Sequence, residues 1–121
     1  MKRLVTALIL TLLASSAWAT TVLTTPNIDM SNNVIPECTA TNVSPTKSLA
    51  VLVVAYRADG SVLGTDGATL PPGQSTTLTT ARVIDSVHCT VTFQGSAKSA
   101  RGAIVSVDGT DFRPLAALPA Q

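Results

Sequence analysis

The chain has 121 residues, with eight lysines and arginines, seven aspartates and glutamates, and a formal net charge of +1. Because this balance is nearly neutral and the basic residues are scattered, the composition excludes a surface for nucleic acid or anionic lipid. Aromatic residues make up only 3% of the chain, too few for a platform on which sugars or bases stack.

The first nineteen residues have the pattern of a helical secretory signal peptide. Met1-Lys2-Arg3 is a basic start, an apolar run follows over 4–13, and Ala17-Trp18-Ala19 is a small-x-small cleavage motif. The apolar run is shorter than the ~20 residues that span a bilayer. We therefore predict cleavage after Ala19, no membrane insertion afterwards, and a single secreted or periplasmic domain over 20–121.

The mature chain begins with a threonine-rich stretch over 20–31, which forms either an edge strand or a loose arm. After it, period-two alternation places Cys38, Ala40 and Asn42 on one face of a strand. Asn42-Val43-Ser44 also fits a glycosylation triplet. Because a turn follows directly, we expect the Asn42 side chain to hydrogen-bond that turn instead.

The middle of the chain alternates apolar runs and turns. Residues 48–56 form the most apolar stretch and predict a central strand covered on both faces. Asp59-Gly60 predicts a hairpin. A polar turn is expected at 64–67, and Pro71-Pro72-Gly73 predicts a type II turn. The threonine-rich strand at 74–81 is expected at or near a sheet edge.

The last third of the chain contains the clearest strand. In residues 87–94, valine, cysteine, valine and phenylalanine alternate with histidine, threonine, threonine and glutamine, so one face is buried and the other wet. A last strand is expected at 101–107, and the tail at 112–119 either packs back or stays loose. We predict an all-β antiparallel sandwich of six or seven strands, with a core over about 33–108 and flexible ends.

Cys38 and Cys89 are the only cysteines. In an exported protein two cysteines usually pair, so we predict a disulfide that pins one sheet to the other. Closing a loop of about fifty residues stabilises a fold by roughly 4 kcal/mol in the chain-entropy model. A redox-active or metal-binding pair is disfavoured, because the chain has no C-x-x-C motif and a single histidine.

No residue is predicted to be catalytic. His88 falls on the wet face of its strand, and Asp85, Ser86 and His88 lie too close in sequence for a catalytic trio. One histidine cannot complete a copper site, and residues 108–111 offer too few ligands for calcium. We therefore predict no enzymatic activity, no cofactor and no metal.

The layout resembles an immunoglobulin-like or fibronectin-III-like sandwich, because one cysteine lies in the second strand and the other in the penultimate one. Asn42-Val43-Ser44, the Asp59-Gly60 hairpin and the stretch Leu70-Pro71-Pro72-Gly73-Gln74-Ser75 look like the turns of bacterial extracytoplasmic Ig-like domains. This resemblance covers about residues 37–107. The chain is also similar to small exported bacterial proteins of no assigned function.

Two kinds of function follow. The first is a non-catalytic structural or protein-interaction module that meets an unknown protein partner in the bacterial envelope or medium. Its expected surfaces are the strand edge at 76–80 and the Asp59-Gly60 hairpin. The second is an inhibitor or accessory subunit of an exported enzyme, using a loop at 65–73. A pilus-type subunit ranks below both, because Pro119-Ala120-Gln121 does not resemble a donor strand.

Overall fold

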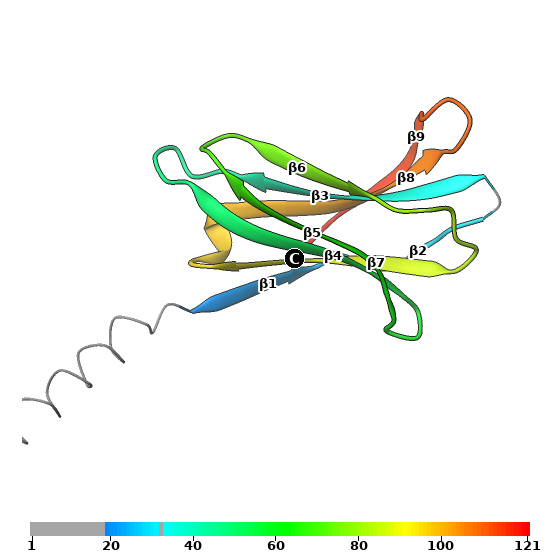
Figure 1. The fold of residues 1–121 in the computed structure, drawn as a ribbon, viewed down its shortest axis with the longest axis horizontal. Coiled ribbons are helices and arrows are strands. Elements are labelled where there is room, and N and C mark those ends of the chain that lie inside the picture. The colour runs from blue at the N-terminus through cyan, green and yellow to red at the C-terminus, as the bar shows by residue number, and fades with distance from the viewer. Residues whose placement is uncertain (1–18, 32) are drawn as a thin grey trace, which may run out of the picture.

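The computed structural model describes residues 19–31 and 33–121, so almost all of the predicted signal peptide lies outside the described residues. As predicted, the described part is all-β, with two antiparallel sheets and one short 3-10 helix, η1 (Ala97–Ser99) (Figure 1). No helix in this part of the chain is both long and apolar enough to cross a membrane. The strands are β1 (Thr20–Thr24), β2 (Ile28–Asp29), β3 (Val34–Asn42), β4 (Leu49–Arg57), β5 (Val62–Leu70), β6 (Ser75–Thr79), β7 (Ser86–Gln94), β8 (Ala100–Asp108) and β9 (Pro114–Pro119).

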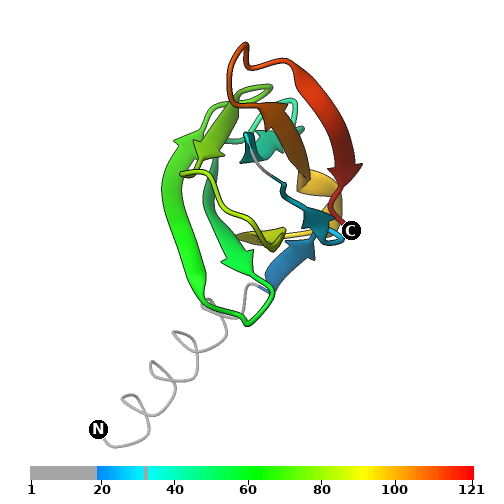
Figure 2. The ribbon, with the colours of Figure 1, turned by 90° about the vertical axis from the view of Figure 1, so that its right-hand side faces the viewer.

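The two sheets form the two layers of a sandwich (Figure 2). The β7 sheet has the order β1-β7-β4-β5, and β2 pairs with β7 beyond the end of β1. The β3 sheet has the order β6-β3-β8-β9. Strands β7 and β3 therefore lie inside their sheets, where each is paired on both sides.

Strands β3 and β7 supply much of the core through strict alternation. The inward side chains of β7 are each at most 3% exposed, and they are Val87, Cys89, Val91 and Phe93. The residues between them face outward and are half-buried or exposed. On β3 the buried positions also alternate, at Val34, Pro36, Cys38, Ala40 and Asn42. The strand prediction for 87–94 is thereby confirmed, including which of its faces is buried.

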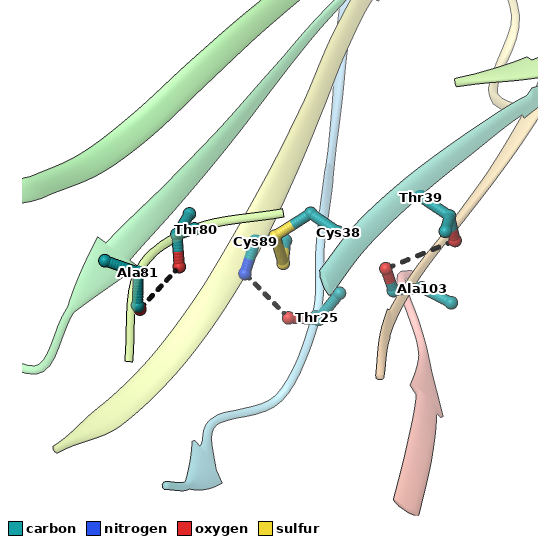
Figure 3. The surroundings of a disulfide bond; sticks show 7 residues. All are labelled: Thr25, Cys38, Thr39, Thr80, Ala81, Cys89 and Ala103. Carbon is teal, nitrogen blue, oxygen red and sulfur yellow. Dashed lines mark hydrogen bonds between the residues drawn. A yellow bond between two sulfur atoms is a disulfide. The ribbon is translucent and has the colours of Figure 1, made fainter. Parts of the chain in front are cut away.

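The predicted disulfide joins the two sheets through the core (Figure 3). Cys38 on β3 and Cys89 on β7 have Cα atoms 5.9 Å apart and are separated by 51 residues in sequence. Beside this bond, Thr25 donates its backbone N–H to the Cys89 carbonyl, and its hydroxyl oxygen accepts the Cys89 N–H, both at 2.9 Å. Thr25 thus satisfies the buried β7 backbone where β1 has ended.

Strand β4 lies in the middle of its sheet, as predicted, but it is not covered on both faces. Its inward residues Val51, Val53 and Ala55 are buried, whereas Leu52 on the outer face is 45% exposed. The described residues form only two layers, so no third layer covers the outside of the β7 sheet. Val54 on that face is nonetheless only 6% exposed, so two-sided burial holds at Val54 and fails at Leu52, where the outer face is open.

Residues 64–67 belong to strand β5 and not to the polar turn that we expected. They pair with β4 from Ala55↔Gly64 to Leu52↔Gly67. A central strand needs hydrogen-bond partners along its whole length, and an edge strand tolerates the glycines that suggested a turn. The loop expected at 65–73 consequently shrinks to the connection at 71–74.

The two short turns predicted from sequence are confirmed. Gly60 and Gly73 have φ angles of 86° and 77°, which favour glycine. Gln74 donates its N–H to the Pro71 carbonyl at 3.0 Å, as expected for a type II turn with Pro72 and Gly73 in its centre.

Both ends of the chain that we expected to be flexible are paired strands. β1 pairs with β7 over its five residues, and β9 pairs with β8. Gln121, just after β9, exchanges backbone hydrogen bonds of 2.9 and 3.1 Å with Thr24. This pair links the two sheets along one side of the sandwich, because edge backbone groups gain a partner there.

The strand order departs from that of an immunoglobulin sandwich. In that fold the strand following the second cysteine strand stays beside it. Here β8 crosses to the other sheet and pairs with β3, while β1 occupies the place next to β7. The resemblance therefore extends to two antiparallel layers and a bridged pair of strands, and not to the order of the strands.

Candidate functional site

The connections between strands gather at two ends of the sandwich (Figure 1). We call one of them the Asn42 end, formed by the connections 43–48, 71–74 and 95–99. The opposite one, which faces the viewer in Figure 2, is the Gly109 end, formed by residues 30, 31 and 33 and by the connections 58–61, 80–85 and 109–113. The binding or catalytic groups of a sandwich commonly lie on such loops, so both ends are candidate sites.

The Asn42 end is organised by a buried amide. Asn42 is fully buried, and its Nδ2 donates to the carbonyls of Lys47 at 2.7 Å and Leu70 at 2.8 Å. Its Oδ1 accepts the N–H of Ser44 at 2.9 Å. The expectation that Asn42 bonds the turn is confirmed. Since its side chain is used in this way and is inaccessible, the glycosylation triplet has no available acceptor.

At the opposite end, three connections converge on Gly109. Its N–H donates to the Asn33 carbonyl at 2.6 Å, and its carbonyl accepts from Arg82 Nη2 at 3.2 Å. Asn33 Nδ2 also donates to the Thr110 hydroxyl at 2.8 Å. A Cβ at residue 109 would lie 2.8 Å from Asn33 Oδ1 and 3.0 Å from Arg82 Nε, so a larger residue would require these two side chains to shift.

The connection from β8 to β9 is closed by an aspartate turn. The Asp108 carboxylate accepts the N–H groups of Thr110 at 2.7 Å and Asp111 at 3.3 Å. These hydrogen bonds, the one from Thr110 foremost, lower the pKa of Asp108 below its ordinary value. The Asp108 carboxylate therefore serves its own turn, and the described residues contain no group of three or more potential metal ligands.

Two large apolar side chains protrude from this end. Ile84, between β6 and β7, is 75% exposed, and Phe112, between β8 and β9, is 62% exposed. Phe112 also has a φ of 56°, a left-handed conformation that is uncommon for a bulky residue. Beside Ile84 lies a shallow depression of about 430 Å³, lined by Ser31, Asn33, Arg82, Val83 and Ile84.

The residues that could suggest catalysis are engaged elsewhere. His88 lies on the outer face of the β7 sheet, and its ring stacks on Tyr56 with centroids 5.1 Å apart. The Ser86 hydroxyl hydrogen-bonds the carboxylate of Asp29, and the Asp85 carboxylate accepts the Ser86 backbone N–H at 2.7 Å. The close spacing of Asp85, Ser86 and His88 in sequence thus creates no nucleophile-to-histidine hydrogen bond among the described residues.

The two surfaces proposed from sequence lie apart. Strand β6 is an edge of the β3 sheet, as expected, and its Thr76 hydroxyl donates to Asp66 on β5 at 2.7 Å. The Asp59-Gly60 hairpin lies at the Gly109 end (Figure 1). There the Asp59 carboxylate accepts from the Ser61 hydroxyl at 2.6 Å and its N–H at 2.9 Å, and both bonds lower the pKa of Asp59.

Comparison with known proteins adds no assignment, since no protein-family model, curated protein or solved structure matches the chain. The candidate site therefore rests on geometry. Sequence reasoning missed Ile84 and Phe112, the most exposed large apolar residues of the described part. No local signal sets the two apart together, because Phe112 stands alone among polar residues whereas Ile84 follows another apolar residue, Val83.

Proposed function

We propose that the protein is an exported, non-catalytic interaction module that binds a protein partner through the Gly109 end. The observation that carries this proposal is the exposure of Ile84 and Phe112, 75% and 62%, on connections that meet at Gly109. Apolar side chains this exposed lose contact with water when a partner covers them, which favours association. Aromatic residues are also enriched among the side chains that dominate binding energy.

The rigidity of the surrounding loops supports the same proposal. Hydrogen bonds to Gly109 from Arg82 and to Asn33 from Gly109 hold the connections that contain Asn33 and Arg82 against the connection at 109–113. A surface that is already ordered loses little conformational entropy when it binds. Arg82 and Arg113 are exposed on the same two connections as Ile84 and Phe112, and arginine is one of the residue types enriched at protein interfaces.

The disulfide supports the exported location, because such bonds persist in oxidising compartments. We place the protein in the periplasm or outside the cell of a bacterium, after cleavage of residues 1–19. The alternative function, an inhibitor or accessory subunit of an exported enzyme, would use this same end, since most of the loop expected at 65–73 is strand β5. It predicts that the captured partner is an enzyme whose rate changes on binding.

The test is affinity capture from the native envelope and medium, with the mature chain immobilised and the captured proteins quantified. The double variant Ile84→Ser with Phe112→Asn removes both apolar side chains, and asparagine tolerates the left-handed conformation. We expect it to weaken binding of the partner about 30-fold or more, the loss typical of dominant interface residues.

The matched control is Val22→Ser with Leu52→Ser. These residues are 52% and 45% exposed, but they lie on β1 and β4, away from the loops. The control should bind like the natural chain. Equal capture by the natural chain and the Ile84/Phe112 variant would contradict the proposal, as would equal losses in both variants.

A second binding mode is favoured by the open side of the sandwich. Strand β5 has nine residues and contains neither proline nor lysine, and among the described strands it forms a ladder with β4 alone, while one side-chain bond, from Thr76 to Asp66, joins it to β6. An edge of this kind can accept an extended segment of another protein as an additional strand. In the same capture experiment, Thr65→Lys with Thr69→Lys should abolish binding in this mode, and should leave binding through the Gly109 end unchanged.

A further inference from the structure

We propose that residues 114–121, here called the β9 arm, exchange between two copies of the chain to form a strand-swapped dimer. In the monomer, the β9 arm pairs with β8 of its own copy. In the dimer, the β9 arm of each copy pairs with β8 of the other copy and makes the same contacts there. The connection at 109–113 acts as the hinge. The inference goes beyond the partner-binding proposal but shares Phe112 with it, here through the backbone conformation of that residue.

The β9 arm is a separable unit. β9 forms a ladder only with β8, from Ala103↔Pro119 to Val107↔Pro114. Most of its side chains are exposed, and only Leu118 and Ala120 pack partly against the core. Beyond β9, Ala120 donates its N–H to the Gly102 carbonyl at 2.8 Å, and Gln121 bonds Thr24. All of these contacts can form equally well between two copies.

The hinge contains the most strained backbone of the described residues. Phe112 and Asn33 are the non-glycine residues with positive φ, and asparagine tolerates that conformation far better than phenylalanine. The Phe112 ring is 62% exposed, so its packing does little to compensate the strain. When β8 and β9 become one continuous strand, Phe112 becomes extended and the strain disappears in both copies.

The closed hinge is held by hydrogen bonds within it and by bonds to two neighbouring connections. Asp108 accepts from Thr110 and Asp111, and it exchanges backbone bonds of 2.9 Å with Phe112 and Arg113. Asn33 also bonds Gly109 and Thr110, and Arg82 bonds the Gly109 carbonyl. Swapping breaks these bonds but keeps every contact of the β9 arm. Strained short hinges favour exchange for this reason, and exchange of an identical element is a low-cost route to a dimer.

A second copy is the fitting occupant, because the place left by the β9 arm is specific to this sequence. A Cβ at Gly102 would lie 3.2 Å from the Ala120 Cβ, so the arm and strand β8 fit closely there. The Thr24–Gln121 backbone pair fixes the end of the arm at a second point. A foreign strand would have to reproduce both contacts, whereas another copy carries them already.

The decisive experiment uses the mature chain with Val105→Cys and Ala117→Cys, which are direct partners across β8 and β9 and close enough to be bridged. The protein is unfolded and reduced in urea with dithiothreitol, refolded at increasing concentration in a glutathione redox buffer that lets the disulfides form during folding, and analysed by non-reducing gel and intact mass. We expect covalent dimers whose fraction rises with concentration. An intrachain bond at every concentration would overturn the proposal, as would a dimer that carries only intrachain bonds.

A second measurement keeps the native cysteines alone and compares dimer fractions by light scattering after refolding. Phe112→Gly relieves the hinge in the monomer, so the dimer should dissociate about a hundredfold more readily, with each of its two hinges contributing roughly a factor of ten. Asp108→Ala, which removes the hinge bonds, should raise the dimer fraction. Ile84→Ser is the control and should leave the dimer fraction unchanged. If Ile84→Ser and Phe112→Gly lower the dimer fraction equally, the dimer forms by ordinary association of exposed apolar side chains, and the swap is refuted.

Discussion

At the Asn42 end, one buried amide bonds two carbonyls and an N–H from neighbouring connections. At the Gly109 end, comparable hydrogen bonds surround a glycine, while Ile84 and Phe112 remain exposed. Both ends are ordered by side chain-to-backbone bonds. The Asn42 end displays one apolar side chain, Val43, at 38% exposure, whereas the Gly109 end displays the two most exposed ones and a strained residue, the combination that accompanies functional sites more often than structural caps.

We infer from this contrast that the Asn42 end serves the stability of the fold and that the Gly109 end serves binding. Removing the buried amide should affect folding and leave binding intact, whereas removing exposed side chains at the Gly109 end should do the reverse. The following changes test that separation, beginning with the link that both ends share.

The largest effect is expected from Cys38→Ala with Cys89→Ala. The bond closes a loop of 51 residues, which restricts the unfolded chain and contributes about 4 kcal/mol to the free energy of unfolding. Urea unfolding of the natural chain and the double variant measures this difference. The backbone amides of both ends should lose protection from hydrogen exchange together, because the disulfide lies between the two ends. A difference below about 1 kcal/mol, or two free thiols in the denatured, unreduced natural protein, would contradict the assignment.

The next effect is confined to one end. Asn42→Ala leaves the buried carbonyl of Leu70 without its side-chain donor and should lower the free energy of unfolding by about 3 kcal/mol. The matched control is Asn27→Ala at an exposed asparagine, with an expected cost of less than about 0.5 kcal/mol. Partner capture per folded molecule should stay unchanged in both variants. If Asn42→Ala and Asn27→Ala lower the free energy of unfolding equally, the buried hydrogen bonds of Asn42 do not stabilise this end.

These predictions also show which features the sequence reveals. The alternation of 87–94 identifies an inward Cys89 and an outward His88 correctly, because a period-two pattern is a local property of a strand with one buried face. The turns at Gly60 and Gly73 are equally local, since each depends on a positive φ. Features of this kind need no knowledge of the rest of the chain.

The misplaced features depend on distant partners. Residues 64–67 look like a turn until β4 provides a ladder for them, and the tail becomes a strand because β8 offers an edge. The crossover of β8 to the β3 sheet likewise reflects pairing among segments far apart in sequence. The exposure of Ile84 and Phe112 follows from how three connections meet around Gly109, so no local pattern announces the candidate site.

A smaller effect of opposite sign is expected at the Gly109 end. Phe112→Gly should raise the free energy of unfolding by about 0.5–1 kcal/mol. Relief of the left-handed conformation is worth about 1–2 kcal/mol and outweighs the extra entropy that glycine gives the unfolded chain. Leu115→Gly, at a residue of β9 without positive φ, is the control and should destabilise. Denaturant unfolding at low protein concentration measures both; destabilisation by Phe112→Gly would show that the ring packs productively.

The smallest effect is a difference in pH response between the two ends. The folded-state pKa values of Asp59 and Asp108 lie below their ordinary values because turn groups of Ser61 and of Thr110 donate to them. A depressed pKa stabilises the fold above the unfolded-state pKa, and this contribution disappears as pH falls through the folded-state value. Acid should therefore loosen the turns of the Gly109 end, whereas Ser44 at the other end bonds an amide that does not titrate.

Amide NMR spectra from about pH 5 to about pH 2 resolve this contrast residue by residue. The N–H signals of Ser61 and Thr110 should shift with the titration of the carboxylates that they contact, while the signal of Ser44 should stay constant. Asp108→Asn should abolish the Thr110 response and keep that of Ser61, because the two turns close independently. A common midpoint at all three amides would mean that acid unfolds the sandwich as one unit, and that its two ends do not differ in the way their turns are held.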